Sequence, residues 1–110
     1  MGLRAALLRI SMLAVELTSL PLIMLASIYL LSGYQMLNPE IKAIPEPRKI
    51  HTDKFLRALT IFLAYLHTLG GVIIIAERRL KGNVKKTVEL LASSLIILLL
   101  IIFLLVEATL

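Results

Sequence analysis

Cysteine is absent from this 110-residue chain, and histidine occurs only twice. Without cysteine, the chain can form no disulfide bond, no thiolate metal site and no iron–sulfur cluster held by its own thiolates. The two histidines, His51 and His67, are then the only side chains with a nitrogen donor suited to a metal. A haem or metal centre with a nitrogen ligand from this chain therefore depends on one or both of them.

The sequence also lacks the motifs of a self-contained enzyme. We find no nucleophile beside a base, no carboxylate pair, no phosphate-binding loop and no cluster of metal ligands. The apolar segments do not contain the interrupted helices and central charges that are typical of transporter substrate sites. We therefore expect neither a hydrolase, a transferase nor a transporter that acts alone.

Apolar residues, by contrast, make up 59% of the chain. Soluble domains average about 45–50% apolar residues, and a soluble fold this small could not hide the excess. The composition predicts an integral membrane protein. The net charge of +5 is not a nucleic-acid signature, because the basic residues cluster at the ends of apolar runs, where they meet lipid head groups.

Three apolar runs predict an all-α fold with three transmembrane helices, over about 17–37, 54–76 and 84–107, in a single membrane domain covering 1–110. Each run is close to the ~20 residues that cross the hydrocarbon layer. We interpret the residues before Leu17 as an uncleaved start of the first helix, with its first turns at the membrane surface. Pro21 predicts a kink between that surface segment and the span.

The connecting segments follow from their turn residues. Asn38-Pro39 ends the first helix, and the loop from Asn38 to about Lys54 contains too many prolines for a regular element. Thr52 or Asp53 is the expected N-cap of the second helix. Gly82-Asn83 predicts a tight turn before the third helix.

Small residues in the first helix predict a packing face. Ser19, Ala26 and Gly33 are spaced seven apart and share one stripe, where another helix can approach closely.

Three spans place the N-terminus and the second loop on one side of the membrane, which has seven basic residues against five on the other side. The positive-inside rule then predicts a multi-pass cell-membrane protein with a cytoplasmic N-terminus. The basic cluster at 78–86 would also suit anionic lipid or an acidic partner.

His67 is the leading candidate for chemistry, because it lies near the middle of the second span. A polar residue at that depth is costly and usually has a partner. A neutral imidazole can ligate haem iron, and Gly71, one turn later, leaves room for a porphyrin edge or a helix. Two other roles stay open: a hydrogen bond to a neighbouring helix, for example to a serine hydroxyl or a backbone carbonyl of the first helix, and a proton- or quinone-linked role.

His51 and Arg57 are secondary candidates. His51 precedes His67 by 16 residues, which places it about 160° round a helix and ~24 Å away, so the two cannot ligate one haem. We expect His51 in the head-group region, either solvated or bound to a propionate. Arg57 either extends its charge outward to water or pairs with a haem propionate or a quinone carbonyl.

The layout of three spans, with His67 in the second and Gly71 four residues later, resembles the small cytochrome b anchor subunits of succinate dehydrogenase and fumarate reductase. Glu77 stands where an acidic residue often closes that helix in this family. The block containing His51, Arg57, His67 and Gly71 is also similar to cytochrome b561-like and formate dehydrogenase-type membrane subunits. The resemblance implies an anchor for a catalytic partner, with His67 as axial ligand of haem b beside a quinone site.

The function expected from the sequence is thus a haem-b- and quinone-linked membrane subunit of a respiratory electron-transfer complex. Its partners would be other membrane subunits, lipid and a quinone. No second ligand lies at the depth of His67, so another chain would have to supply it. The alternative is a non-catalytic accessory subunit that packs against a larger complex through the small-residue faces of its first two helices.

Overall fold

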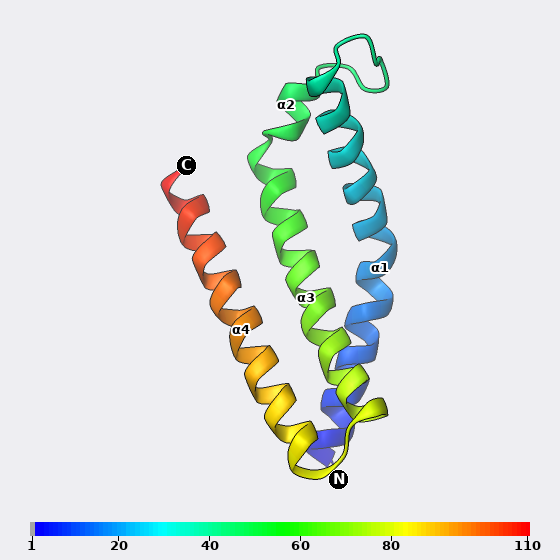
Figure 1. Ribbon diagram of the computed structural model, residues 1–110, viewed down its shortest axis with the longest axis vertical. Helices are drawn as coiled ribbons and strands as arrows, with labels where there is room; N and C mark the ends of the chain where they lie inside the picture. Colours follow the sequence, from blue (N-terminus) through cyan, green and yellow to red (C-terminus); the bar gives the residue numbers. More distant parts are fainter. Residues whose placement is uncertain (1) are drawn as a thin grey trace.

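The computed structural model describes residues 2–110, which fold into three long helices and one short one (Figure 1). The long helices are α1 (Gly2–Leu37), α3 (Lys54–Arg79) and α4 (Gly82–Thr109); the short one is α2 (Pro47–His51). Each long helix is long and apolar enough to cross a membrane, and the described residues contain no strand. The predicted all-α, three-span, multi-pass membrane fold is confirmed.

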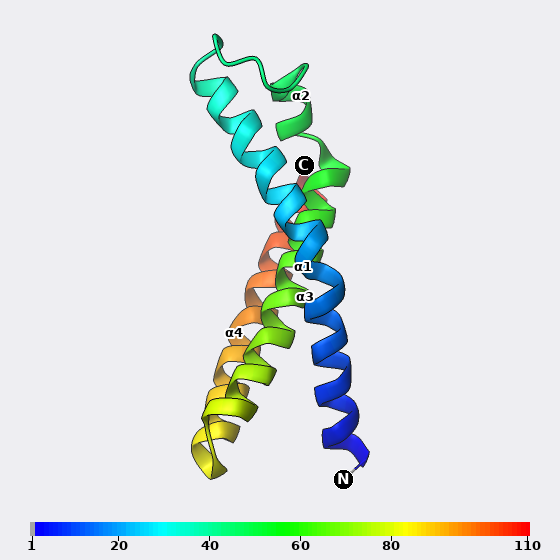
Figure 2. The ribbon, with the colours of Figure 1, turned by 90° about the vertical axis from the view of Figure 1, so that its right-hand side faces the viewer.

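Helix α3 lies between the other two long helices. It packs against α1 on one side and α4 on the other, and α2 packs against the end of α1. Figures 1 and 2 show the N-terminus at the same end as the α3–α4 connection, with the C-terminus toward the other end. The layout therefore has two interhelical interfaces that share α3.

Helix α1 is continuous over 36 residues, and its axis bends in the middle third, the region that contains Pro21 (Figure 2). A proline in a helix interior removes one backbone hydrogen bond, which explains the bend. The first turns of α1 do not form a separate surface segment. They lie along α3, because the backbone of Ser11 approaches Gly70 and Arg4 reaches Glu77.

The connections differ in part from expectation. Asp53 is the N-cap of α3, as predicted, and its carboxylate accepts a hydrogen bond from the backbone N–H of Leu56 at 2.9 Å. The expectation of an irregular 38–54 loop is wrong, because α2 begins at Pro47, a residue that suits the first turn of a helix. The predicted Gly82-Asn83 turn is also displaced: α3 ends at Arg79, and α4 begins at Gly82, which has φ +60°.

Two layers of ion pairs indicate where the membrane lies. Arg57 binds Glu107 at one end of α3, and Glu77 binds Arg4 at the other. About 30 Å of helix separates Arg57 from Glu77 at 1.5 Å per residue, which matches the ~30 Å hydrocarbon layer. His67 lies midway between these two layers along α3, ten residues from each.

The buried face of α1 is a seven-residue stripe, but not the predicted one. Ser19 and Ala26 are exposed within this chain, and Gly33 is half-buried. The stripe that packs is displaced by one position and contains three hydroxyl residues and one leucine: Ser11, Thr18, Leu25 and Ser32. It is this stripe that meets the two histidines.

Candidate functional site

The central contact of the molecule joins His67 on α3 to Thr18 on α1. The imidazole Nδ1 lies 2.9 Å from the Thr18 hydroxyl, and Thr18 is only 2% exposed. The hydroxyl donates its proton to the carbonyl of Ala14 at 2.6 Å, one turn back in α1. Because that proton is used, the Nδ1–H of His67 donates to the Thr18 oxygen. The hydrogen-bond network therefore assigns the proton to Nδ1 and leaves a lone pair on Nε2.

The Nε2 atom of the half-buried His67 is not fully buried within the chain. It has no hydrogen-bond partner among the described residues. Among these residues, the one fully buried side-chain polar atom that lacks a hydrogen-bond partner is the Tyr29 hydroxyl oxygen. No group of three or more metal-ligating side chains occurs among residues 2–110. At mid-depth, the chain thus presents a single oriented nitrogen ligand.

The glycines after His67 have different surroundings. A Cβ on Gly70 would lie 2.9 Å from the carbonyl oxygen of Ser11 and 3.2 Å from a methyl of Val15, so Gly70 permits the close approach of α1. A Cβ on Gly71 would meet nothing within 4 Å. Gly71, the residue selected from the sequence, therefore borders open space one turn from His67, while Gly70 carries the helix contact.

His51 repeats the arrangement of His67 at the end of α1. Its Nδ1 lies 2.8 Å from the hydroxyl of Ser32, which is 0% exposed and donates to the carbonyl of Tyr29 at 3.1 Å. The Tyr29 ring contacts the imidazole edge-on, with centroids 5.3 Å apart. His51 is half-buried and fastens α2 to α1, which differs from the expected solvated position. It lies far from His67, as predicted.

Arg57 is engaged within the chain. Its Nε and Nη2 donate to the Glu107 carboxylate at 2.7 and 3.1 Å, and its Nη1 donates to the Thr52 carbonyl at 2.7 Å. It borders a cavity of about 370 Å³ between the three long helices, where Tyr29 and Phe103 supply apolar walls. A propionate or a quinone carbonyl would have to displace Glu107 to bind this guanidinium.

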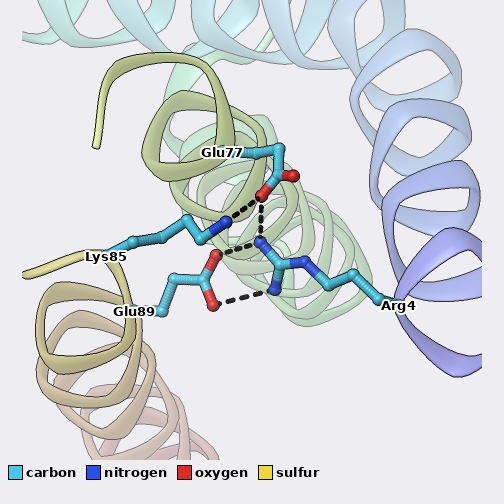
Figure 3. Close-up of polar contacts among 4 residues, drawn as sticks. All are labelled: Arg4, Glu77, Lys85 and Glu89. Atoms are coloured by element: carbon cyan, nitrogen blue, oxygen red, sulfur yellow. Dashed lines mark hydrogen bonds and ion pairs between the residues drawn. The ribbon is translucent and has the colours of Figure 1, made fainter. Parts of the chain in front are cut away.

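A second ionic cluster joins all three long helices at the opposite end (Figure 3). The guanidinium of Arg4 lies between two carboxylates: it contacts Glu89 through two nitrogens at 2.7 and 3.0 Å, and Glu77 at 2.5 Å. Lys85 donates to the same Glu77 oxygen at 2.9 Å. The two cations and two anions balance, so the cluster fixes the helix ends without net charge.

Glu16 occupies an unusual position on α1. It lies two residues before Thr18, and therefore near the depth of His67, yet it is exposed and forms no ion pair among the described residues. From the sequence, we expected that the helix before Leu17 begins at the membrane surface. A carboxylate that faces hydrocarbon at mid-depth is costly, and such residues normally face protein or a water-filled cavity.

Sequence reasoning missed Thr18, Gly70 and Glu107. Thr18 could have been found from the spacing of Ser11, Thr18 and Ser32, which places three hydroxyls on one stripe of an otherwise apolar helix. Glu107 is the only carboxylate near the C-terminal end of the last span, so it was the natural partner for Arg57. Nothing local distinguishes Gly70 from Gly71.

Comparison of the chain with protein-family models, with curated proteins and with solved structures finds no match. The likeness to cytochrome b anchor subunits therefore depends on the layout of three spans and on His67, Gly71 and Glu77. Of these, Glu77 forms ion pairs with Arg4 and Lys85, His67 bonds to Thr18 through Nδ1, and a Cβ on Gly71 would meet no atom within 4 Å.

Proposed function

We propose that this chain is a membrane subunit of a larger respiratory assembly and that Nε2 of His67 is an axial ligand of haem b. The observation that carries the proposal is the Thr18–His67 hydrogen bond at mid-depth, because it orients the ring and keeps the lone pair on the ligating nitrogen. A Cβ at Gly71, one turn from His67, would meet no atom within 4 Å, so no side chain of this chain obstructs a bound group at that position. When bound, haem b would pass single electrons between a partner protein and membrane quinone.

The protein residues have distinct roles in this proposal. Thr18 is a positioning residue, since it touches only the far nitrogen of the imidazole and is itself held by Ala14. The second ligand comes from another chain, either a partner subunit or a second copy. We further propose that the N-terminus faces the cytoplasm, because the end that holds it and the α3–α4 connection carries seven basic residues against five at the other end.

A second candidate function is a non-catalytic accessory subunit, and Glu16 favours it. An exposed carboxylate near mid-depth requires a covering protein with a cation or hydrogen-bond donor, whether or not haem is present. Ser19 and Ala26, exposed on the same helix, would let the covering helix approach closely. In this case the Thr18–His67 bond serves only to fasten α1 to α3.

The optical spectrum of the complex, purified in mild detergent from its native membrane, distinguishes the two functions. We expect a Soret band that is lost in His67→Ala and retained in the matched control His51→Ala. Thr18→Val should keep the band but shift the haem reduction potential, because the ring loses its hydrogen-bond acceptor. A band that survives His67→Ala would contradict the ligand assignment, and an assembled complex without haem on this chain would support the accessory role.

A further inference from the structure

The two ends of the bundle differ in the charge that remains after internal pairing. The end that holds the N-terminus and the α3–α4 connection has seven basic residues and three carboxylates, counting Glu16. The other end has five basic residues and four carboxylates. Two of these seven basic residues form ion pairs within the chain: Arg4 with Glu77 and Glu89, and Lys85 with Glu77. Four cations around the connection are exposed and form no ion pair among the described residues: Arg78, Arg79, Lys81 and Lys86.

A cavity of about 430 Å³ opens beside one of these cations. Its apolar walls come from all three long helices, through Leu7 of α1, Ile73 of α3 and Leu90 of α4, and Ser93 completes the lining. Lys86 stands at its border. The one carboxylate of the lining, Glu89, has both oxygens bound to Arg4, so it does not neutralise Lys86.

We propose that this cavity binds an anionic phospholipid, with the phosphate on Lys86 and the start of an acyl chain against Leu7, Ile73 and Leu90. An apolar cavity beside an unpaired cation, at the level of an ion-pair layer, has the chemistry of a lipid at the membrane boundary. Arg78, Arg79 and Lys81 add attraction for anionic head groups. An acidic protein surface would match the charge of the cations but would leave the apolar walls of the cavity without an apolar partner. The site is independent of haem binding at His67.

The chain has no tryptophan, so a single introduced tryptophan reports on the lipid around it. Val84→Trp and Phe55→Trp are matched reporters, because both residues are exposed (59% and 72%) in the first turn of a long helix, at opposite ends of the bundle. Each variant is reconstituted in mixed phosphatidylglycerol–phosphatidylcholine bilayers in which only one lipid carries brominated acyl chains. Quenching of the tryptophan fluorescence then measures which lipid is adjacent.

We expect brominated phosphatidylglycerol to quench Val84→Trp several-fold more than brominated phosphatidylcholine at equal mole fraction, and to quench Phe55→Trp about equally. Each Lys or Arg near an anionic surface contributes up to roughly five-fold in affinity. The preference should therefore disappear when Arg78, Arg79, Lys81 and Lys86 are all changed to Gln. Lys86→Gln alone should remove the largest part of it.

The matched control removes four cations at the other end, by changing Lys42, Arg48, Lys49 and Lys54 to Gln, and should leave the preference intact. Circular dichroism of each variant confirms that the helices are retained. Equal quenching by the two lipids at Val84→Trp would overturn the proposal. So would a preference that survives the loss of all four cations, or one that is the same at both ends; binding of an acidic protein without lipid selectivity would assign the surface to that partner instead.

Discussion

The two interfaces of α3 are built in opposite ways. Toward α1, the centre is polar and close: the Thr18–His67 hydrogen bond and the Gly70–Ser11 approach lie in the middle of the span. Toward α4, the centre is apolar, with Tyr65 and Phe103 in contact at 6.0 Å between ring centroids. The α3–α4 ion pairs occur at the ends, through Arg57–Glu107 and Lys85–Glu77.

The difference shows what positions a helix when lipid is as apolar as the protein. Burial of apolar surface gives little net gain in a bilayer, so close packing and hydrogen bonds decide which faces meet. The α1–α3 interface has such contacts at its centre, where sliding one helix by a turn would separate Thr18 from His67. The α3–α4 interface is fixed mainly by a short connection and charges near water. Perturbations of the first interface should therefore be the more costly.

Changing Gly70 to Ala should have the largest effect. The new methyl would lie 2.9 Å from the Ser11 carbonyl, so α1 must move away, at about 1–3 kcal/mol of unfolding free energy. Gly71→Ala is the control, because its methyl meets nothing within 4 Å and alanine favours a helix by up to about 1 kcal/mol. Denaturant titration in mixed micelles measures both. Equal effects of the two substitutions would contradict the assigned close approach.

Thr18→Val should come next, since it removes the hydroxyl and keeps the shape. Interhelical hydrogen bonds in membranes are worth about 0.6–2 kcal/mol, so a loss in that range is expected in the same titration. Ser19→Val is the control: Ser19 is exposed and bonds only to its own helix, at the Val15 carbonyl. The double variant Thr18→Val, His67→Ala should lose little more unfolding free energy than His67→Ala alone. Additive losses would mean that the two side chains are not coupled.

Glu107→Gln should have the smallest effect and should be the one that depends on salt. The Arg57–Glu107 pair is partly exposed, with side-chain exposures of 28% and 13%, and exposed pairs are screened by ions. Its loss should shift the unfolding midpoint at low salt and much less at high salt. Glu40→Gln, which removes an unpaired carboxylate at the same end, should shift neither. If Glu107→Gln lowered the stability equally at low and high salt, the Arg57–Glu107 pair would be less exposed to water than the structure indicates.

The sequence was sufficient for the spans and for the depth of His67, because both follow from the position of apolar runs relative to charges. It was not sufficient for the rotation of α1. That helix is apolar on every side, and Ser19–Ala26–Gly33 and Ser11–Thr18–Ser32 are equally regular patterns one residue apart. Only contact with His67, His51 and Gly70 selects the second pattern, and such contacts belong to the tertiary structure.

The short helix α2 shows a related limit. The prolines of residues 38–47 correctly predict an interrupted chain, but Pro47 is also a favourable first residue of a helix. The five-residue helix that begins at Pro47 ends at His51, which bonds to Ser32 of α1. A helix this short has little intrinsic stability, so its existence depends on a tertiary contact that propensities do not include.

The hydrogen bond between Thr18 and His67 joins residues 49 positions apart. During translation at ~5–20 residues per second, Thr18 is synthesised about 2–10 s before its partner histidine. Throughout that interval the hydroxyl can bond only to Ala14 of its own helix, and Glu16 beside it is also uncovered. Helices α3 and α4, joined by two residues, can enter the bilayer as one hairpin. The first helix is therefore the one that an insertion chaperone, or an already assembled neighbour, must protect until the hairpin arrives.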